Sequence, residues 1–365
     1  MKGCVSIGKK KVRITSQQER IGAFDFFRAY GCLAIVLLHV ISAWRDDPTS
    51  SNCFYSVGNT ELIFDNAIIP LLVRMAVPMF FMMSGALFLN PDRNVTRDSI
   101  CSHLKKILIN LCLFGYLMAI IELIVVSKSF EPKFLYIAVV NLLQEKTWSH
   151  LWYLYATVGL YLITPILRPW ISNISRRGFS EAIIVAVVLF SVIPTINDIL
   201  SLQITQFGLT TPRGALLWYL LGYYLLVIHE DCKSYKKGLL HLALLLGAVL
   251  TAVFGIVGFQ MKITLIQPYH ICIVLYSSAL YIIMLRNRLI EQVAKSRIIK
   301  LLSSCSLVVY IIHPVFLNVL YKGIHLYPDR FPPVLGEALI FFLVSAASVI
   351  GALIIKKIPL LKKYV

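Results

Sequence analysis

Long apolar runs restrict the fold of this chain more than any other feature. A helix that crosses a bilayer needs about 20 apolar residues. Runs near that length occupy residues 24–44, 66–89, 107–126, 151–170, 181–196, 214–228, 238–259, 263–285, 301–321 and 335–355. Because backbone groups in lipid must bond within their own segment, these runs predict an all-α polytopic membrane protein of about ten transmembrane helices.

The charge content supports this class. Only 15% of the 365 residues are charged, whereas soluble domains average about a quarter. The mean hydropathy is +0.77. A net charge of +17 is common in nucleic-acid-binding proteins, but the position of the basic residues explains it in another way.

The Lys and Arg residues gather on alternate sides of the predicted helices. With the N-terminus in the cytoplasm, the inside segments hold 25 of them and the outside segments hold 8. Cytoplasmic loops carry such an excess, so we predict that both termini are cytoplasmic. Residues 1–23 and 356–365 are then basic tails around a transmembrane domain at 24–355, and no nucleic-acid partner is expected.

Other sequence features add less. The eight cysteines show no metal-binding or redox spacing, so we expect neither a metal site nor a disulfide framework. The apolar stretch from Phe134 to Leu143 has ten residues. That length is more typical of a re-entrant or interfacial helix than of a membrane span.

The first apolar run carries ionisable residues within FDFFRAYGCLAIVLLHV, residues 24–40. Such residues are costly in hydrocarbon and are therefore functional candidates. Eleven helical steps separate Arg28 from His39, which puts them on one face, roughly 20° apart and ~16 Å along the axis. Asp25 lies one turn before Arg28 on that face. The pattern indicates two functional positions, called stations below, on one face of the helix: Asp25 with Arg28 near one membrane surface, and His39 near mid-depth.

Arg74 lies in the outer half of the second run. A guanidinium stays charged, so it needs a carboxylate, carbonyl groups or an anionic ligand, or it must extend toward the outer surface. Both interpretations remain open. Pro78, Ser84 and Gly85 follow in the same run and predict a kinked or closely approached backbone.

His103, Lys105 and Lys106 begin the third run at the predicted cytoplasmic surface. They are either a positive-inside anchor or a clamp for the phosphates of a nucleotide-bearing donor.

Two further histidines have alternative interpretations. His150 precedes Trp152 at the start of the fourth run, where an aromatic belt is expected without any function, although both residues are also candidates for contact with a sugar. His313 precedes Pro314. It is either satisfied by the carbonyl groups that the proline frees or directed into a cavity.

Five segments in order resemble the acyltransferase-3 family of bacterial integral membrane acyltransferases. They are the Arg-x10-His helix, MFFMMSGALFL, the His-x-Lys-Lys cluster, HLWYLYATVGLYLITPIL and YIIHPV. The resemblance covers nearly the whole chain and is greatest to surface-polysaccharide O-acetyltransferases. One departure is that His-x-Lys-Lys stands where arginines are common in the family.

The resemblance implies an O-acyltransferase, an enzyme that transfers groups other than amino-acyl groups, in the bacterial plasma membrane. Its donor would be acetyl-CoA or another short acyl-CoA, with no permanently bound cofactor, and its acceptor a lipid-linked or surface glycan. His39 would be the general base or a transient acyl carrier. Arg28, Lys105 and Lys106 would attract the donor phosphates, and Asp25 would orient Arg28.

Two other function classes remain open. A transporter or flippase would also place His and Arg residues within the membrane, although the sequence shows no internal repeat of the transporter kind. A sensor or assembly protein without chemistry accounts less well for the ionisable face of the first helix.

Overall fold

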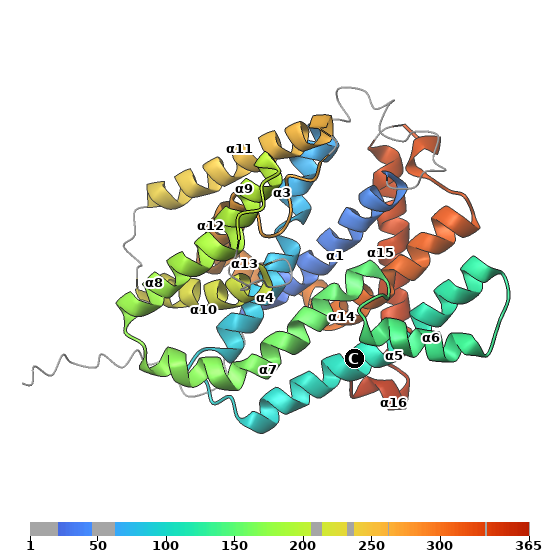
Figure 1. Ribbon diagram of the computed structural model, residues 1–365, viewed down its shortest axis with the longest axis horizontal. Helices are drawn as coiled ribbons and strands as arrows, with labels where there is room; N and C mark the ends of the chain where they lie inside the picture. The colour runs from blue at the N-terminus through green and yellow to red at the C-terminus, as the bar shows by residue number, and fades with distance from the viewer. Residues whose placement is uncertain are drawn as a thin grey trace, which may run out of the picture.

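The computed structural model describes residues 21–45, 63–205, 214–231, 237–261, 263–332 and 334–364, and every regular element in these ranges is a helix (Figure 1). The all-helical prediction is therefore confirmed for the described part. Residues 1–20 of the predicted N-terminal tail lie outside it. The longer elements are α1 (Gly22–Arg45), α4 (Ala76–Phe88), α5 (Arg97–Ser127), α7 (Trp152–Asn173), α8 (Arg176–Val187), α10 (Ala215–Asp231), α11 (Lys237–Met261), α12 (Ile271–Arg286), α14 (Arg297–Asn318) and α15 (Leu335–Ile355).

Shorter elements extend or join these helices. They are the π-helices η1 (Phe64–Ile68), η3 (Val188–Val192) and η5 (Val319–Gly323), the 3-10 turns η2 (Ser149–Leu151) and η6 (Pro328–Arg330), and α3 (Ile69–Val73), α6 (Lys133–Leu143), α9 (Ile193–Leu200), α13 (Arg288–Val293) and α16 (Pro359–Lys362). The fifth apolar run is accordingly longer than predicted, because α8, η3 and α9 continue one another from Arg176 to Leu200.

Eight helical segments of the described chain are long and apolar enough to cross a membrane. Two of the ten predicted spans are shorter, because α10 has 17 residues and α12 has 16. The predicted run at 263–285 is wrong at its start, since helix α12 begins only at Ile271. The eleven residues of α6 agree with the expectation that this stretch is too short for a span.

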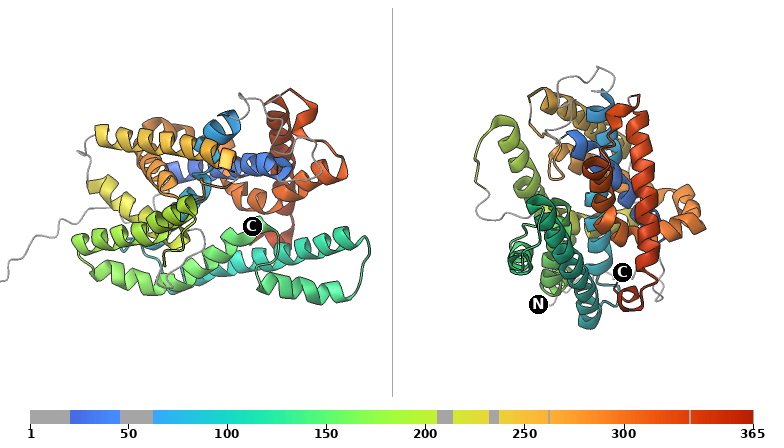
Figure 2. Two further views of the ribbon diagram at one scale, coloured as in Figure 1. Left: turned by 45° about the horizontal axis from the view of Figure 1, so that its top comes forward. Right: turned by 90° about the vertical axis from the view of Figure 1, so that its right-hand side faces the viewer.

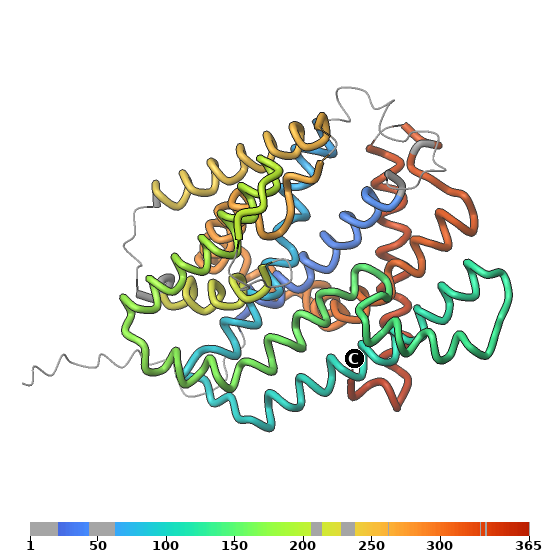
Figure 3. The backbone as a smooth tube through the Cα atoms, viewed as in Figure 1, coloured from blue at the N-terminus to red at the C-terminus, as the bar shows by residue number. Residues whose placement is uncertain are grey.

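Helix α1 runs through the middle of the molecule, where it packs against α4, α14 and α15 (Figures 1 and 3). Its buried side chains, which include Cys32, Ile35 and Val36, form part of the apolar core between these helices. On one side of the bundle α5 lies against α6 and α7 (Figure 2). On this central helix Asp25 is buried, and Arg28 and His39 are half-buried.

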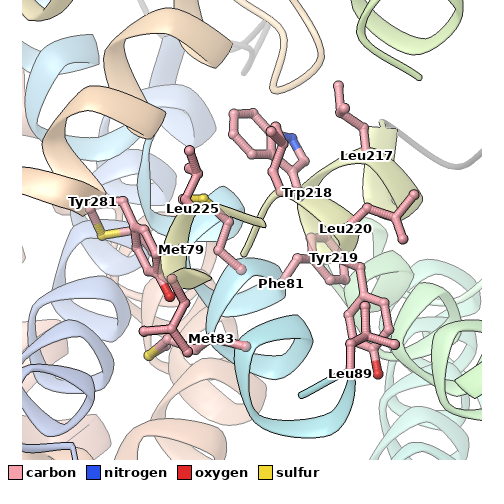
Figure 4. Close-up of a cluster of buried hydrophobic side chains, with 14 of the residues drawn as sticks. Met79, Phe81, Met83, Leu89, Leu217, Trp218, Tyr219, Leu220, Leu225 and Tyr281 are labelled. Atoms are coloured by element: carbon pink, nitrogen blue, oxygen red, sulfur yellow. The ribbon is translucent and has the colours of Figure 1, made fainter. Parts of the chain in front are cut away.

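Helices α4 and α10 approach each other closely. A Cβ atom added to Gly85 would lie 1.8 Å from the Tyr219 carbonyl oxygen, and one added to Gly222 would lie 1.9 Å from that of Met82. The two backbones are therefore in direct contact, as the small residue at Gly85 led us to expect. Buried side chains around the crossing, among them Phe81 and Trp218, fill the core (Figure 4).

The second apolar run is kinked where α3 gives way to α4. The helix is interrupted at Arg74 and Met75, and the cause is Pro78, which has no N–H to donate to the Arg74 carbonyl group. The Tyr30 hydroxyl of α1 donates a hydrogen bond to the Leu72 carbonyl at 2.7 Å. The interrupted backbone is thus stabilised by a side chain from the central helix.

Contacts between distant segments agree with the predicted sides. The Arg168 guanidinium donates to the carbonyl oxygens of Phe88 and Asn90 at 2.7 and 3.0 Å. The Asn110 amide donates to the Tyr364 carbonyl at 2.7 Å. Each contact joins segments at or next to the predicted cytoplasmic face, while the orientation of the termini stays a prediction.

Candidate active site

Three histidines from distant parts of the sequence meet inside the bundle. His39 comes from α1, His150 from η2 and His313 from α14. The ring centroids of His39 and His313 are 5.1 Å apart, those of His150 and His313 5.5 Å, and those of His39 and His150 6.2 Å. The structure therefore brings His150 and His313 to the residue that the sequence singled out on α1.

His150 is held in place by two backbone contacts. It is buried, and its Nε2 lies 3.1 Å from the Ile311 carbonyl oxygen, which can only accept, so Nε2 must carry the proton. The Tyr310 hydroxyl donates a hydrogen bond to the His150 carbonyl. Both contacts come from α14, which fixes the start of α7 against that helix.

His313 is fully buried and only half satisfied. Its Nδ1 lies 3.1 Å from the Val309 carbonyl oxygen and donates to it. Its Nε2 has no hydrogen-bond partner among the described residues. The two sequence alternatives for His313 thus each describe one ring nitrogen. A backbone carbonyl satisfies Nδ1, and Nε2 is left as a bare acceptor in a ring that lies beside those of His39 and His150.

A small cavity lies against this group, which we call the histidine cavity. Its volume is about 90 Å³, enough for several water molecules or one small acyl group. It is lined by Ile35, Leu38, His39, Val73, Arg74, Val77, Ser149, His150, Trp152, Pro268 and Tyr310. Arg74 is half-buried, so its guanidinium contributes positive charge to a site that also holds two imidazole rings.

The histidine cavity lies toward one end of the bundle. His39 lies ~26 Å along α1 from Gly22 and ~9 Å before Arg45, by the rise of an α-helix. It is therefore nearer the predicted outer end than the mid-depth position expected from the sequence. His150 agrees with this placement, because it lies in η2, just before the predicted outer end of α7.

The other station of α1 is an ion pair ~16 Å from His39. Arg28 Nη1 lies 3.4 Å from Asp25 Oδ1, and the Ser303 hydroxyl donates to the same oxygen at 2.9 Å. The Asp25 side chain is 3% exposed, whereas that of Arg28 is 34% exposed. The buried carboxylate thus orients a guanidinium that remains accessible to a ligand.

Comparison with known proteins gives a family. The sequence model of the acyltransferase-3 family, described as an acyltransferase domain, matches residues 21–357. The chain belongs to the acyltransferase-3 family. The match confirms the resemblance to this family over nearly the whole chain. Comparisons with curated proteins and with solved structures find no match.

The other candidate site residues of this acyltransferase do not line the histidine cavity. His103, Lys105 and Lys106 are exposed on the first turns of α5, where the His103 ring packs edge-on against Phe88 with centroids 5.1 Å apart. This position fits an anchor and a phosphate clamp equally. Ser84 is half-buried on α4, within hydrogen-bonding reach of Tyr161.

One polar cluster next to the histidine cavity was not predicted from the sequence. The Tyr269 hydroxyl donates to Asp198 Oδ2 at 2.9 Å, and Nε2 of the fully buried His270 lies 2.8 Å from the same oxygen. The cluster fastens the loop before α12 to the end of α9, and Pro268 of that loop lines the histidine cavity. A proline and a histidine just before the apolar run could have signalled a helix start there.

Proposed function

We propose that this membrane acyltransferase transfers an acyl group, acetyl in the first instance, from cytoplasmic acyl-CoA to a hydroxyl of a lipid-linked or cell-surface glycan. The proposed location is the bacterial plasma membrane. One observation carries the proposal: His39 lines a cavity where three histidines converge, and the accessible Arg28 lies ~16 Å away on the same helix. A long donor whose phosphates rest near Arg28 would present its thioester at His39.

The proposed step is a single acyl transfer. His39 removes the proton from the acceptor hydroxyl while its oxygen attacks the thioester carbonyl carbon. A new C–O bond forms, the C–S bond breaks, and the departing thiolate takes the proton from the imidazolium. The products are the glycan ester and CoA with a free thiol, so atoms and charges balance.

The neighbouring groups have roles that their positions support. The bare Nε2 of His313 can accept a hydrogen bond from the His39 ring and so set its orientation. Arg74 in the cavity wall supplies positive charge for the oxyanion that develops on the thioester carbonyl. Both groups belong to packed helices, which limits their reorganisation during the reaction.

The proposal is tested by mass spectrometry of cell-surface glycans from cells with and without the gene. Loss of an ester while the polymer persists is the expected result. Loss of the whole polymer would instead point to transport of the glycan and would overturn the proposed transfer.

A further inference from the structure

A second cavity adjoins the histidine cavity. It has a volume of about 230 Å³ and shares Leu38, Val73 and Arg74 with its neighbour. Its other polar side chains include Asp65 and Asn66, so we call it the Asp65 cavity. A ligand held there would lie directly beside the site of transfer.

An acidic residue at the start of an apolar run is usually solvated, but the structure buries Asp65. Asp65 is 7% exposed and Asn66 is 9% exposed, and both line the cavity. They belong to η1, a single π-helical turn. Such turns are rare and occur frequently at functional sites.

The walls of the Asp65 cavity are fixed by backbone contacts. A Cβ atom added to Gly255 of α11 would lie 1.7 Å from the Asn66 carbonyl oxygen, and one added to Gly258 would lie 2.6 Å from that of Ile263. Residues 263–266 form part of the wall, and the Asp198–His270 contact anchors the end of the same loop. The site is therefore preorganised, which lowers the entropic cost of binding.

The polar groups suit a neutral ligand with several hydroxyl groups. A carboxylate accepts hydrogen bonds, an amide both accepts and donates them, and the Arg74 guanidinium donates them. An anionic ligand would gain from Arg74 but would be repelled by Asp65. Apolar lining from Phe254 and Ile69 offers a surface for ring carbons.

We propose that the Asp65 cavity binds the pyranose ring that carries the accepting hydroxyl, with Asp65 and Asn66 as its recognition residues. The inference rests on the proposed function and names the substrate class of that site. The volume is below the roughly 300–1,000 Å³ typical of pockets for drug-sized ligands, so one ring rather than an oligosaccharide would be enclosed. The shared wall at Leu38 and Arg74 would let one hydroxyl reach the histidine cavity.

The test measures binding without any acyl donor. Purified protein in a detergent that lacks sugar is titrated with octyl β-D-glucoside, octyl β-D-galactoside and octyl N-acetyl-β-D-glucosaminide. Octyl tetraethylene glycol, which has the same tail and no ring, is the control ligand. At least one glycoside should raise the unfolding temperature beyond the tail control. Asp65→Asn and Asn66→Ala should each weaken the binding of that glycoside about tenfold, as expected for losing a hydrogen bond in a buried site.

Two control variants keep the result interpretable. Glu181→Gln changes an exposed acid on α8 and should bind as the parent protein does. Ile263→Trp places a bulky ring at an exposed position that lines the Asp65 cavity. This variant should block binding while Asp65 stays intact, so it tests the proposal even if an Asp65 variant does not fold. Binding that survives both Asp65→Asn and Ile263→Trp would overturn the proposal, as would stabilisation by none of the glycosides.

A transfer assay separates this inference from the proposed function. With a glycoside that binds, Asp65→Asn should raise the acceptor KM about tenfold and leave the acyl-CoA KM unchanged. A higher acyl-CoA KM with an unchanged acceptor KM would count against the cavity as the acceptor site. Glycoside binding that depends on Asp65 in a protein that transfers no acyl group would support the cavity and refute the transferase activity.

Discussion

At the scale of single residues, His313 allows a structural role to be separated from a functional one. A buried nitrogen without a partner costs stability, about 1–3 kcal/mol. His313→Leu removes that nitrogen at similar volume, so we expect an equal or higher unfolding temperature together with at least tenfold slower transfer. A variant that loses stability and retains activity would show that His313 serves packing alone. Thermal unfolding and acyl transfer are measured on the same preparation.

Arg28 is the residue that should hold the donor. Each contact with a charged group contributes roughly 1.5–3 kcal/mol, so Arg28→Ala should raise the acyl-CoA KM tenfold or more. The matched control is Arg177→Ala, because Arg177 forms an exposed pair with Glu181 at 3.0 Å. The double change Lys105→Ala/Lys106→Ala should act in the same direction if the cluster clamps phosphate. Unchanged acyl-CoA saturation in the double variant would leave those lysines as a topology anchor.

At the scale of elements, the crossing of α4 and α10 is the contact least tolerant of change. Gly222→Ala would force a Cβ atom toward the Met82 carbonyl oxygen, 1.9 Å away, so the backbones must separate. We expect a loss of several kcal/mol of stability, in the range of overpacking or more. Gly159→Ala in α7 is the control, because its Cβ would meet nothing within 4 Å. Equal unfolding temperatures for the two variants would contradict the close crossing.

The elements also show how far the sequence predicts the structure. Apolar length was sufficient to predict the helical class, Pro78 predicted the kink in the second run, and residue spacing predicted that Asp25, Arg28 and His39 lie on one helix. The start of α12 was predicted too early, because the apolar Ile263, Leu265 and Ile266 were joined to the helix although Pro268 and His270 precede it. The loop is held by Asp198, about 70 positions earlier, and no local pattern reports such a contact.

The candidate site was predictable only in part for the same reason. His39 and Arg74 stand out because a charge or an imidazole within an apolar run is costly. Asp65 and Ser303 do not stand out, since the first looks like a loop acid and the second like any small polar residue. Their importance comes from contacts made in three dimensions: one lines a cavity, and the other binds Asp25 across 278 positions.

At the scale of the whole molecule, the orientation in the membrane follows from the Lys and Arg asymmetry of 25 to 8. Reporter fusions after Lys237 and Lys363 should report the cytoplasm, and fusions after Asp47 and Asp329 should report the outside. A C-terminal fusion that reports the outside would mean that the number of crossings is odd.

The role of His39 as the base determines whether the bundle is an enzyme of the proposed kind. His39→Gln keeps hydrogen bonding but cannot accept a proton at neutral pH, so acyl transfer should fall by roughly 10²-fold or more. The acyl-CoA KM and the unfolding temperature should stay near those of the parent protein. His241→Gln, an exposed histidine on α11, is the matched control and should transfer normally.

The most direct measurement is the rate of ester formation by His39→Gln at matched membrane expression. We expect a fall of two orders of magnitude or more with intact folding. Near-normal ester formation would contradict this expectation, because His39 would then only satisfy a hydrogen bond and the base would lie elsewhere in the histidine cavity.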